Sequence, residues 1–307
     1  MPIPALYLVT VLIWGTSWYA MELQLGVVAI ELSIVYRYLL AAGFLLLFCL
    51  ATGRRLRFGR VAHGYMAAQG LLLFSINYLL FYWAANYLIS GLLAVCFSTI
   101  VVMNIVNGAL FFRQTVDPVV AVAAVLGLGG LGLVFWPEIA GVELSHAAAF
   151  GLLLSLVATY LASLGNMISV RYKQLGIPVI ESNALGMAYG ALFTLVVVLV
   201  RGVPIAFDPS AAYVGSLAYL ALFASVIGFG CYLTLVQRIG ADRAAYTSVL
   251  FPVVALGMST LLEGYRWTLP AALGVLLVLA GNLLVLMRRR RPVPTSAPLP
   301  VTARSCD

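Results

Sequence analysis

The sequence predicts an all-α membrane protein in which ten transmembrane helices form two inverted five-helix repeats around a central cavity. Hydrophobic residues make up 64% of the 307 residues and charged residues only 9%, whereas a typical soluble domain is about half apolar and a quarter charged. The apolar residues fall into ten largely uncharged stretches, and the last five resemble a weaker copy of the first five. A chain of this composition needs lipid as its solvent.

Each apolar stretch has about 20 residues, the length that a helix needs to cross a bilayer. Helices are expected because backbone groups in lipid must pair within the chain, and the period-2 alternation of barrel strands is absent. The first stretch is interpreted as a span because it lacks the basic start and the cleavage site of a signal peptide. The predicted spans are residues 4–22, 30–51, 64–85, 92–112, 119–136, 147–170, 179–200, 211–236, 244–262 and 269–287.

The distribution of Lys and Arg predicts the orientation. Nearly all of them lie in the loops after the even-numbered spans and in the tail, which places both termini in the cytoplasm. We expect a multi-pass protein of a bacterial-type inner (plasma) membrane.

The two copies share their order of features. Residues 111–135 parallel residues 263–287, with Pro118 matching Pro270 and Gly129 matching Gly281. Because five spans is an odd number, the copies must enter the membrane from opposite sides, which is typical of transporters with a site at the repeat interface. The predicted division is a first repeat at 1–136, a connecting loop at 137–146, a second repeat at 147–291 and a disordered cytoplasmic tail at 292–307.

Several function classes are disfavoured. The net charge of +7 comes from residues at helix ends and in the tail, so no nucleic-acid partner is expected. His63 and His146 stand alone and no CxxC motif occurs, so we expect no metal and no cofactor. An enzyme would need a nucleophile–base pair or metal ligands within the membrane. A passive channel or a structural protein is the remaining rival to a transporter.

Neutral polar and aromatic residues are the candidates for a binding site. No acidic residue lies at a predicted midplane, which argues against a carboxylate proton relay. Tyr78 and Tyr82 are four residues apart and share a helix face, and so do Trp14 and Trp18, with Ser17 beside them. Of these three residues in span one, Trp14 and Ser17 are preferred to Trp18. Each has a structural alternative, either an aromatic belt at the membrane interface or packing between helices. The predicted substrate-binding residues are Trp14, Ser17, Tyr78, Tyr82, Phe97, Asn104, Tyr160, Ser163, Asn166 and Tyr246.

Three segments support a resemblance to a known family. They are WGTSWYA near the start, ELSIVYRYLLAA at 31–42 with Arg37, and LLEGYRW at 261–267. In order and spacing they resemble the EamA-type ten-helix members of the drug/metabolite transporter superfamily. The position that matches Glu263 in the first half is Phe111, a departure from the family's Gly-Glu element. The aromatic third span is similar to that of YddG-like amino-acid exporters.

The resemblance implies a basket of helices around a cavity lined by spans one to four and six to nine, with spans five and ten peripheral. It also implies export of aromatic and other neutral amino acids. We expect Tyr hydroxyls and Asn amides to bind carboxylate and ammonium without any full charge, and transport to proceed by alternating access without proton coupling. Export of other small metabolites or toxic aromatic cations is the alternative. Amino acids and the lipid bilayer are the expected partners of a monomer.

Overall fold

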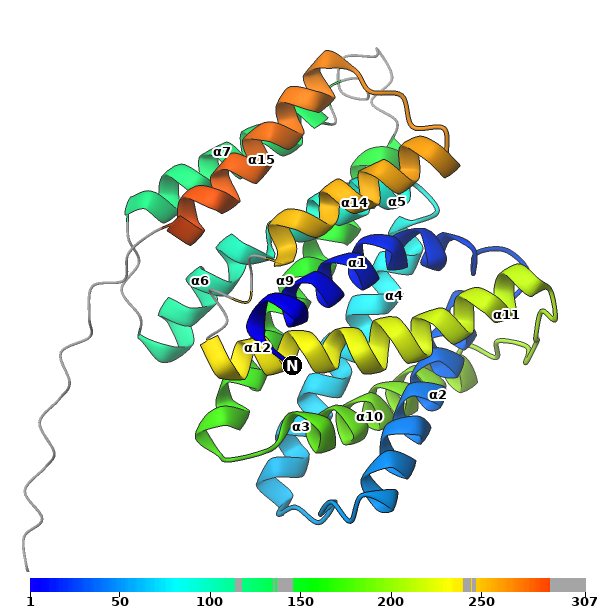
Figure 1. The fold of residues 1–307 in the computed structure, drawn as a ribbon. Coiled ribbons are helices and arrows are strands. Elements are labelled where there is room, and N and C mark those ends of the chain that lie inside the picture. Colours follow the sequence, from blue (N-terminus) through cyan, green and yellow to red (C-terminus); the bar gives the residue numbers. More distant parts are fainter. Residues whose placement is uncertain (114–117, 135, 137–145, 240–243, 245–246, 288–307) are drawn as a thin grey trace, which may run out of the picture.

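The computed structural model describes residues 1–113, 118–134, 136, 146–239, 244 and 247–287, and these residues form helices and connecting turns without a β-strand (Figure 1). The first part of the chain contains α1 (Ile3–Glu22), α2 (Ile30–Ala51), α3 (Arg60–Leu71), η1 (Leu72–Ile76), α4 (Asn77–Ala84), α5 (Ser90–Ser98), α6 (Ile100–Phe112) and α7 (Pro118–Val134). The second part contains α9 (His146–Gln174), α10 (Val179–Val200), α11 (Ala211–Ala218), η2 (Tyr219–Gly228), α12 (Phe229–Ile239), α14 (Thr247–Leu262) and α15 (Leu269–Met287).

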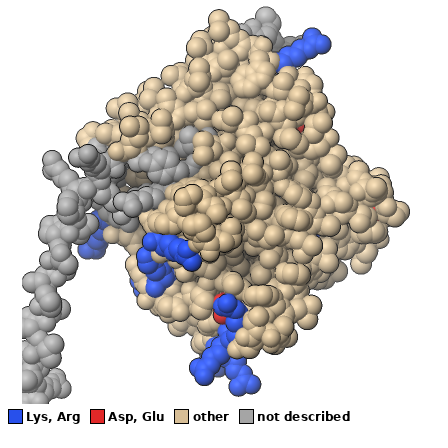
Figure 2. All heavy atoms as spheres, viewed as in Figure 1, with Lys and Arg blue, Asp and Glu red and all other residues tan. Residues whose placement is uncertain are grey.

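The helices are those of a multi-pass membrane protein. Seven continuous helical segments in the described residues are long and apolar enough to cross a membrane, and three shorter apolar helices accompany them. Large apolar side chains such as Leu47, Val200 and Leu261 are exposed, and Figure 2 shows a broad uncharged surface with Lys and Arg gathered towards its ends. Lipid would cover this surface. The number of membrane spans, ten, stays a prediction.

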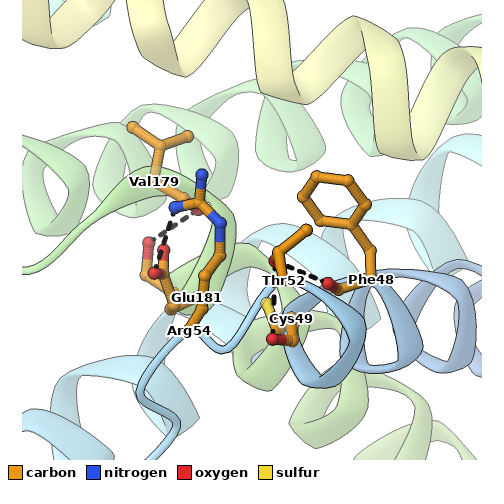
Figure 3. Close-up of polar contacts among 7 residues, drawn as sticks. Phe48, Cys49, Thr52, Arg54, Val179 and Glu181 are labelled. Carbon is orange, nitrogen blue, oxygen red and sulfur yellow. Dashed lines mark hydrogen bonds and ion pairs between the residues drawn. The ribbon is translucent and has the colours of Figure 1, made fainter.

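Helices α2 and α10 pack against each other (Figure 1). They run in opposite directions, because an ion pair joins the end of each helix to the start of the other. Arg54, just after α2, places its Nη1 atom 3.2 Å from Oε1 of Glu181 in the first turn of α10 (Figure 3). At the opposite end, Arg201 after α10 pairs with Glu31 in the first turn of α2. Each carboxylate also lies at a helix N-terminus, where negative charge is favourable. The second and seventh predicted spans therefore lie together and run in opposite directions.

The second antiparallel pair, α7 and α15, lies at one edge of the helix bundle (Figure 1). The Gly-rich run at 127–132 belongs to α7 and allows its close contact with α15. A Cβ atom on Gly130 would lie 2.6 Å from the backbone oxygen of Gly274, and one on Gly274 would lie 2.5 Å from that of Gly130. Small residues that let helix backbones approach are a common means of association in lipid.

Two helical segments have π-helical hydrogen bonding. Segment η1 lies between α3 and α4, and η2 lies between α11 and α12, so each interrupts one long helix. They fall in the third and eighth predicted spans, which are equivalent in the two proposed repeats. A π-helical turn leaves backbone groups with altered partners and is frequent at functional sites. Leu73 of η1 lines a cavity of the protein, and η2 ends next to Phe229 of α12, which lines the same cavity.

Candidate functional site

A cavity lies among helices from both parts of the chain. The first part contributes residues of α1, α2, η1, α4, α5 and α6, and the second part contributes residues of α9, α12 and α14. The residues that line it are Trp14, Ser17, Trp18, Met21, Arg37, Leu73, Asn77, Tyr78, Phe81, Phe97, Ile100, Ala162, Asn166, Phe229, Tyr232 and Phe251.

The cavity is narrow in this conformation. The centre of a water molecule can occupy about 50 Å³ of it. One water requires roughly 10–15 Å³ by this measure, so there is room for a few waters or one small polar group. A whole amino acid is larger than this space.

Aromatic rings form much of the wall. The Trp14 ring lies edge-on to Phe229, with centroids 5.0 Å apart, and tilted against Tyr232 at 4.9 Å. Trp18 meets Phe81 at 5.1 Å in a T-shaped contact. These distances and angles are those of favourable ring pairs. The wall therefore combines apolar area with ring faces that attract cations.

The π-helical segment η2 positions two of the lining residues. The indole nitrogen of Trp14 donates a hydrogen bond of 3.2 Å to the backbone oxygen of Ala224. The next residue, Ser225, donates its hydroxyl to the backbone oxygen of Leu220, five residues earlier, at 2.9 Å. The same Ser225 oxygen accepts a 3.0 Å bond from Nε of Arg37. The irregular helix thus fixes an indole on α1 and a guanidinium on α2.

Arg37 brings a full positive charge to the cavity, although it is only 2% exposed. Its Nη2 donates to the Tyr78 hydroxyl at 3.4 Å, and its Cζ lies 4.4 Å from the centroid of that ring. A second ring, that of Tyr38, is 5.3 Å away. The lining of this cavity therefore includes a full charge, whereas a site of neutral groups alone was expected, because the inner face of α2 carries this side chain into it.

A chain of neutral polar groups lies beside Asn166. Its amide nitrogen donates to the Tyr232 hydroxyl at 3.3 Å and to Oδ1 of Asn104 at 3.4 Å. Asn107, one turn further along α6, donates to the Ser163 hydroxyl at 2.8 Å. These bonds join α6, α9 and α12, so buried amides in lipid find partners on neighbouring helices.

Five of the predicted binding residues line the cavity: Trp14, Ser17, Tyr78, Phe97 and Asn166. Asn104 and Ser163 lie outside the lining, in the adjoining polar chain. Tyr82 also lies outside it, and its hydroxyl donates to Oε1 of Gln24 at 2.8 Å. Tyr160 is 41% exposed and is not part of the lining. Tyr246 falls outside the described residues.

The angular positions of the residues around the third predicted span explain why Tyr78 lines the cavity and Tyr82 does not. Leu73, Asn77 and Phe81 recur every four residues along the lining, with Tyr78 beside them. On an α-helix, Tyr82 lies about 90° from the middle of the face formed by residues 77, 78 and 81. Ser75 points instead to Thr194 of α10, with a hydroxyl–hydroxyl distance of 2.8 Å.

Lining residues absent from the predicted set include Arg37, Trp18, Asn77 and Phe229. Arg37 had a usable signal, because an ionisable residue within a membrane span is by default a functional candidate. Trp18 lies four residues after Trp14, but Trp14 and Ser17 were preferred to it in the sequence analysis. Phe229 had no signal in the sequence, since its placement depends on which face of α12 turns inward. Span seven, helix α10, contributes no residue to the lining, contrary to what the resemblance implied.

Comparison with known families identifies the architecture. The model of the EamA-like transporter family matches residues 2–136 and 149–287. The chain belongs to the EamA-like transporter family. A solved structure shares the fold with a TM-score of 0.70 at 14% identity, and the alignment covers 92% of this chain and 95% of that one.

Curated relatives of this EamA-like transporter are distant but extend over most of the chain. Protein PagO of Salmonella typhimurium is 23% identical over 291 residues, which cover 95% of both proteins. A probable amino-acid metabolite efflux pump of Escherichia coli is 24% identical over 289 residues, covering 90% of this chain and 92% of the relative. The family assignment makes this protein a multi-pass membrane transporter.

Proposed function

We propose that this EamA-like transporter exports aromatic and other neutral amino acids from the cytoplasm. The observation that carries the proposal is a cavity whose wall is largely aromatic and whose polar groups are mostly uncharged. Aromatic faces can pack on an apolar side chain and attract an ammonium group. Hydroxyls and amides such as those of Ser17, Asn77 and Asn166 can accept or donate hydrogen bonds to the amino-acid backbone. The five predicted residues in the lining are the proposed substrate contacts.

A relative supports the substrate class. The Escherichia coli protein described as a probable amino-acid metabolite efflux pump aligns with most of this chain. At 24% identity the likeness makes amino acids a reasonable class to test and leaves the range of side chains open.

Transport would proceed by alternating access of two inverted five-helix repeats, at residues 1–136 and 147–291, within a ten-span protein. Support comes from the antiparallel pairing of α2 with α10 and of α7 with α15, because each pair combines equivalent helices of the two repeats. The small volume of the cavity also agrees with a site that must widen to one side before a whole amino acid can enter.

Proton coupling is not part of the proposed mechanism. Among the residues that the structure describes, no Asp or Glu lines the cavity. Coupled transporters commonly use carboxylates or histidines as proton sites. We therefore propose that the outward gradient of amino acid drives export, from a bacterial-type inner membrane with both termini in the cytoplasm.

The direct test is counterflow in proteoliposomes that contain the purified protein, with radiolabelled L-phenylalanine or L-methionine and a panel of competitors. We expect exchange of labelled for unlabelled amino acid, which a channel or an enzyme would not produce. A pH gradient imposed without any amino-acid gradient should give no accumulation. Accumulation driven by protons alone would refute the uncoupled mechanism, and exchange of aromatic cations without any amino acid would favour the alternative cargo.

The cavity residues can be tested with one substitution and a matched control. Tyr78→Ala removes a lining ring and should lower amino-acid counterflow about tenfold, in line with the loss of a buried aromatic contact. Tyr87→Ala removes a tyrosine that is 44% exposed and lies outside the lining, and it should leave counterflow unchanged. Equal activity of both variants and the unmodified protein would refute the site.

A further inference from the structure

We propose that Arg37 is the carboxylate-binding residue of the transporter, so that its cargo must carry a carboxylate. This inference rests on the proposed export of amino acids and narrows it: free amino acids and related carboxylates bind, whereas their amides and the corresponding amines bind poorly. Arg37 carries a guanidinium that lies within a membrane span and faces a cavity.

The charge of Arg37 has no acidic partner in the described part of the chain. The described ion pairs involve Arg54 and Arg201, and their carboxylates, Glu181 and Glu31, lie at the ends of α10 and α2. Glu263 accepts hydrogen bonds from the backbone and side chain of Ser90, at the start of α5. Arg37 donates hydrogen bonds to the hydroxyls of Ser225 and Tyr78, and the hydroxyl of Tyr82 also lies close enough to interact with it. All three partners are neutral.

A buried charge without a countercharge is costly. Desolvation of one ion inside a protein still costs several kcal/mol after relaxation, and residues that bear such a charge in membrane spans usually serve a function. The Tyr78 and Tyr38 rings offset part of the cost, since the Cζ of Arg37 lies within 6 Å of both centroids. Rings attract a cation without neutralising it, so the cavity keeps its positive charge.

The chemistry of the guanidinium selects the ligand. It presents five N–H donors in a planar fork that matches a carboxylate, and bidentate pairs of this kind are strong and directional. Ser225 holds Nε and Tyr78 contacts Nη2, so the fork is oriented before a ligand arrives. The cavity has room for a group of a few atoms in this conformation, and a carboxylate is a group of that size.

The positive charge of Arg37 also disfavours organic cations as cargo. An organic cation would gain from the aromatic rings of Trp14 and Trp18 but would share a low-dielectric cavity with Arg37, and like charges repel strongly there. A zwitterion places its carboxylate on Arg37 and can turn its ammonium towards the rings. The cavity thus favours molecules that carry a negative group over aromatic cations.

The test compares each amino acid with derivatives that lack the carboxylate. Radiolabelled L-phenylalanine counterflow is measured with unlabelled L-phenylalanine, L-phenylalaninamide, phenethylamine or 3-phenylpropionate as competitor, and L-methionine with its amide is a second series. In the unmodified protein we expect the amide and the amine to compete at least tenfold more weakly than the amino acid, as for the loss of a charge-assisted hydrogen bond. Comparable competition by the amino acid and its amide would overturn the inference and leave amino-acid export standing.

Substitutions of Arg37 distinguish a role in substrate binding from a role in holding the helices in place. Arg37→Gln should abolish the preference for carboxylate over amide, and Arg37→Lys should keep part of it, because Lys retains the charge without the fork. Arg266→Gln is the control, since it removes one exposed positive charge that lies outside the cavity. If Arg37 only held η2 and α4 in place, Arg37→Gln would reduce flux of amino acid and amide alike, and an unaltered preference in that variant would overturn the inference.

The outcomes distinguish the two proposals. If Arg37→Gln does not yield a folded protein, the competitor series on the unmodified protein decides the inference by itself. Failure of the unmodified protein to exchange any amino acid would refute the proposed function, and this inference would fall with it.

Discussion

The position of the Trp14 side chain depends on the backbone path of the π-helical segment η2. Its indole reaches the backbone of η2 and packs over Gly228, where any side chain would collide with it. The residue is recognisable from the sequence as a span-one aromatic. Its partner is not, because the altered hydrogen bonding of η2 follows from tertiary contacts that leave no local sequence pattern.

The contact between Trp14 and Gly228 predicts that alanine substitutions at two nearby glycines differ in their effect on stability and transport. A Cβ atom on Gly228 would lie 2.6 Å from the Trp14 indole nitrogen, whereas one on Gly230 would meet nothing within 4 Å. Gly228→Ala should displace the indole, cost about 1–3 kcal/mol of stability and reduce counterflow, while Gly230→Ala should change neither. Thermal unfolding in detergent and counterflow measure both effects. Equal behaviour of the two variants would contradict the packing of Trp14 described above.

Helices α2 and α10 combine an ordinary apolar composition with acidic residues at matching places. In the sequence, Ile30-Glu31 stands at the start of span two and Ile180-Glu181 near the start of span seven. The partners, Arg201 and Arg54, follow the end of the opposite helix. Sequence patterns predicted the helices and their equivalence, but the pairing needs the helices to lie together.

The exposed fractions of the two side chains in an ion pair predict which of them costs more stability when it is replaced. In the pair of Arg201 with Glu31, the arginine side chain is 55% exposed and the glutamate 7%. Arg201→Gln leaves a buried carboxylate without a charged partner and should cost about 1–3 kcal/mol. Glu31→Gln leaves an exposed arginine that water can solvate, so its cost should be within about 1 kcal/mol.

Thermal unfolding of the purified variants in detergent measures this difference. The double variant, with Glu31→Gln and Arg201→Gln together, should recover part of the stability that Arg201→Gln loses, because no unpaired carboxylate remains. An equal loss in both single variants, or no recovery in the double variant, would show that the ion pair does not contribute in this way.

The assembled protein is a belt of exposed apolar helices around a cavity with one buried positive charge. Its proposed orientation makes a prediction that uses the chain's own cysteines. Cys49, Cys96 and Cys231 are buried and free, and Cys306 lies in the tail that is predicted to be cytoplasmic.

A membrane-impermeant maleimide should therefore not label Cys306 in right-side-out vesicles, but should label it after permeabilisation. An added cysteine at Arg266→Cys, in the Cys306→Ser background, should be labelled in both conditions, because this loop is predicted to face outward. Cys306→Ser without the added cysteine should give no signal. Labelling of Cys306 in intact right-side-out vesicles would reverse the proposed orientation.

The sequence by itself determined that this protein is helical and lies in a membrane, and it indicated the bounds of most spans to within a few residues. Length and hydropathy suffice for this, because lipid requires every span to be an apolar helix of about 20 residues. It also pointed to Trp14, Ser17, Tyr78, Phe97 and Asn166, which now line one cavity.

Only the tertiary structure decided which faces turn inward. Apolar spans have little contrast between their sides, since lipid and protein interior are both apolar, so periodicity could not separate Tyr78 from Tyr82 or assign Trp18 and Phe229. Arg37 was visible as a charge in the sequence, but its role depends on contacts with Ser225 and Tyr78 from segments far along the chain. The charge of the cavity follows from helix packing, which no local pattern of residues records.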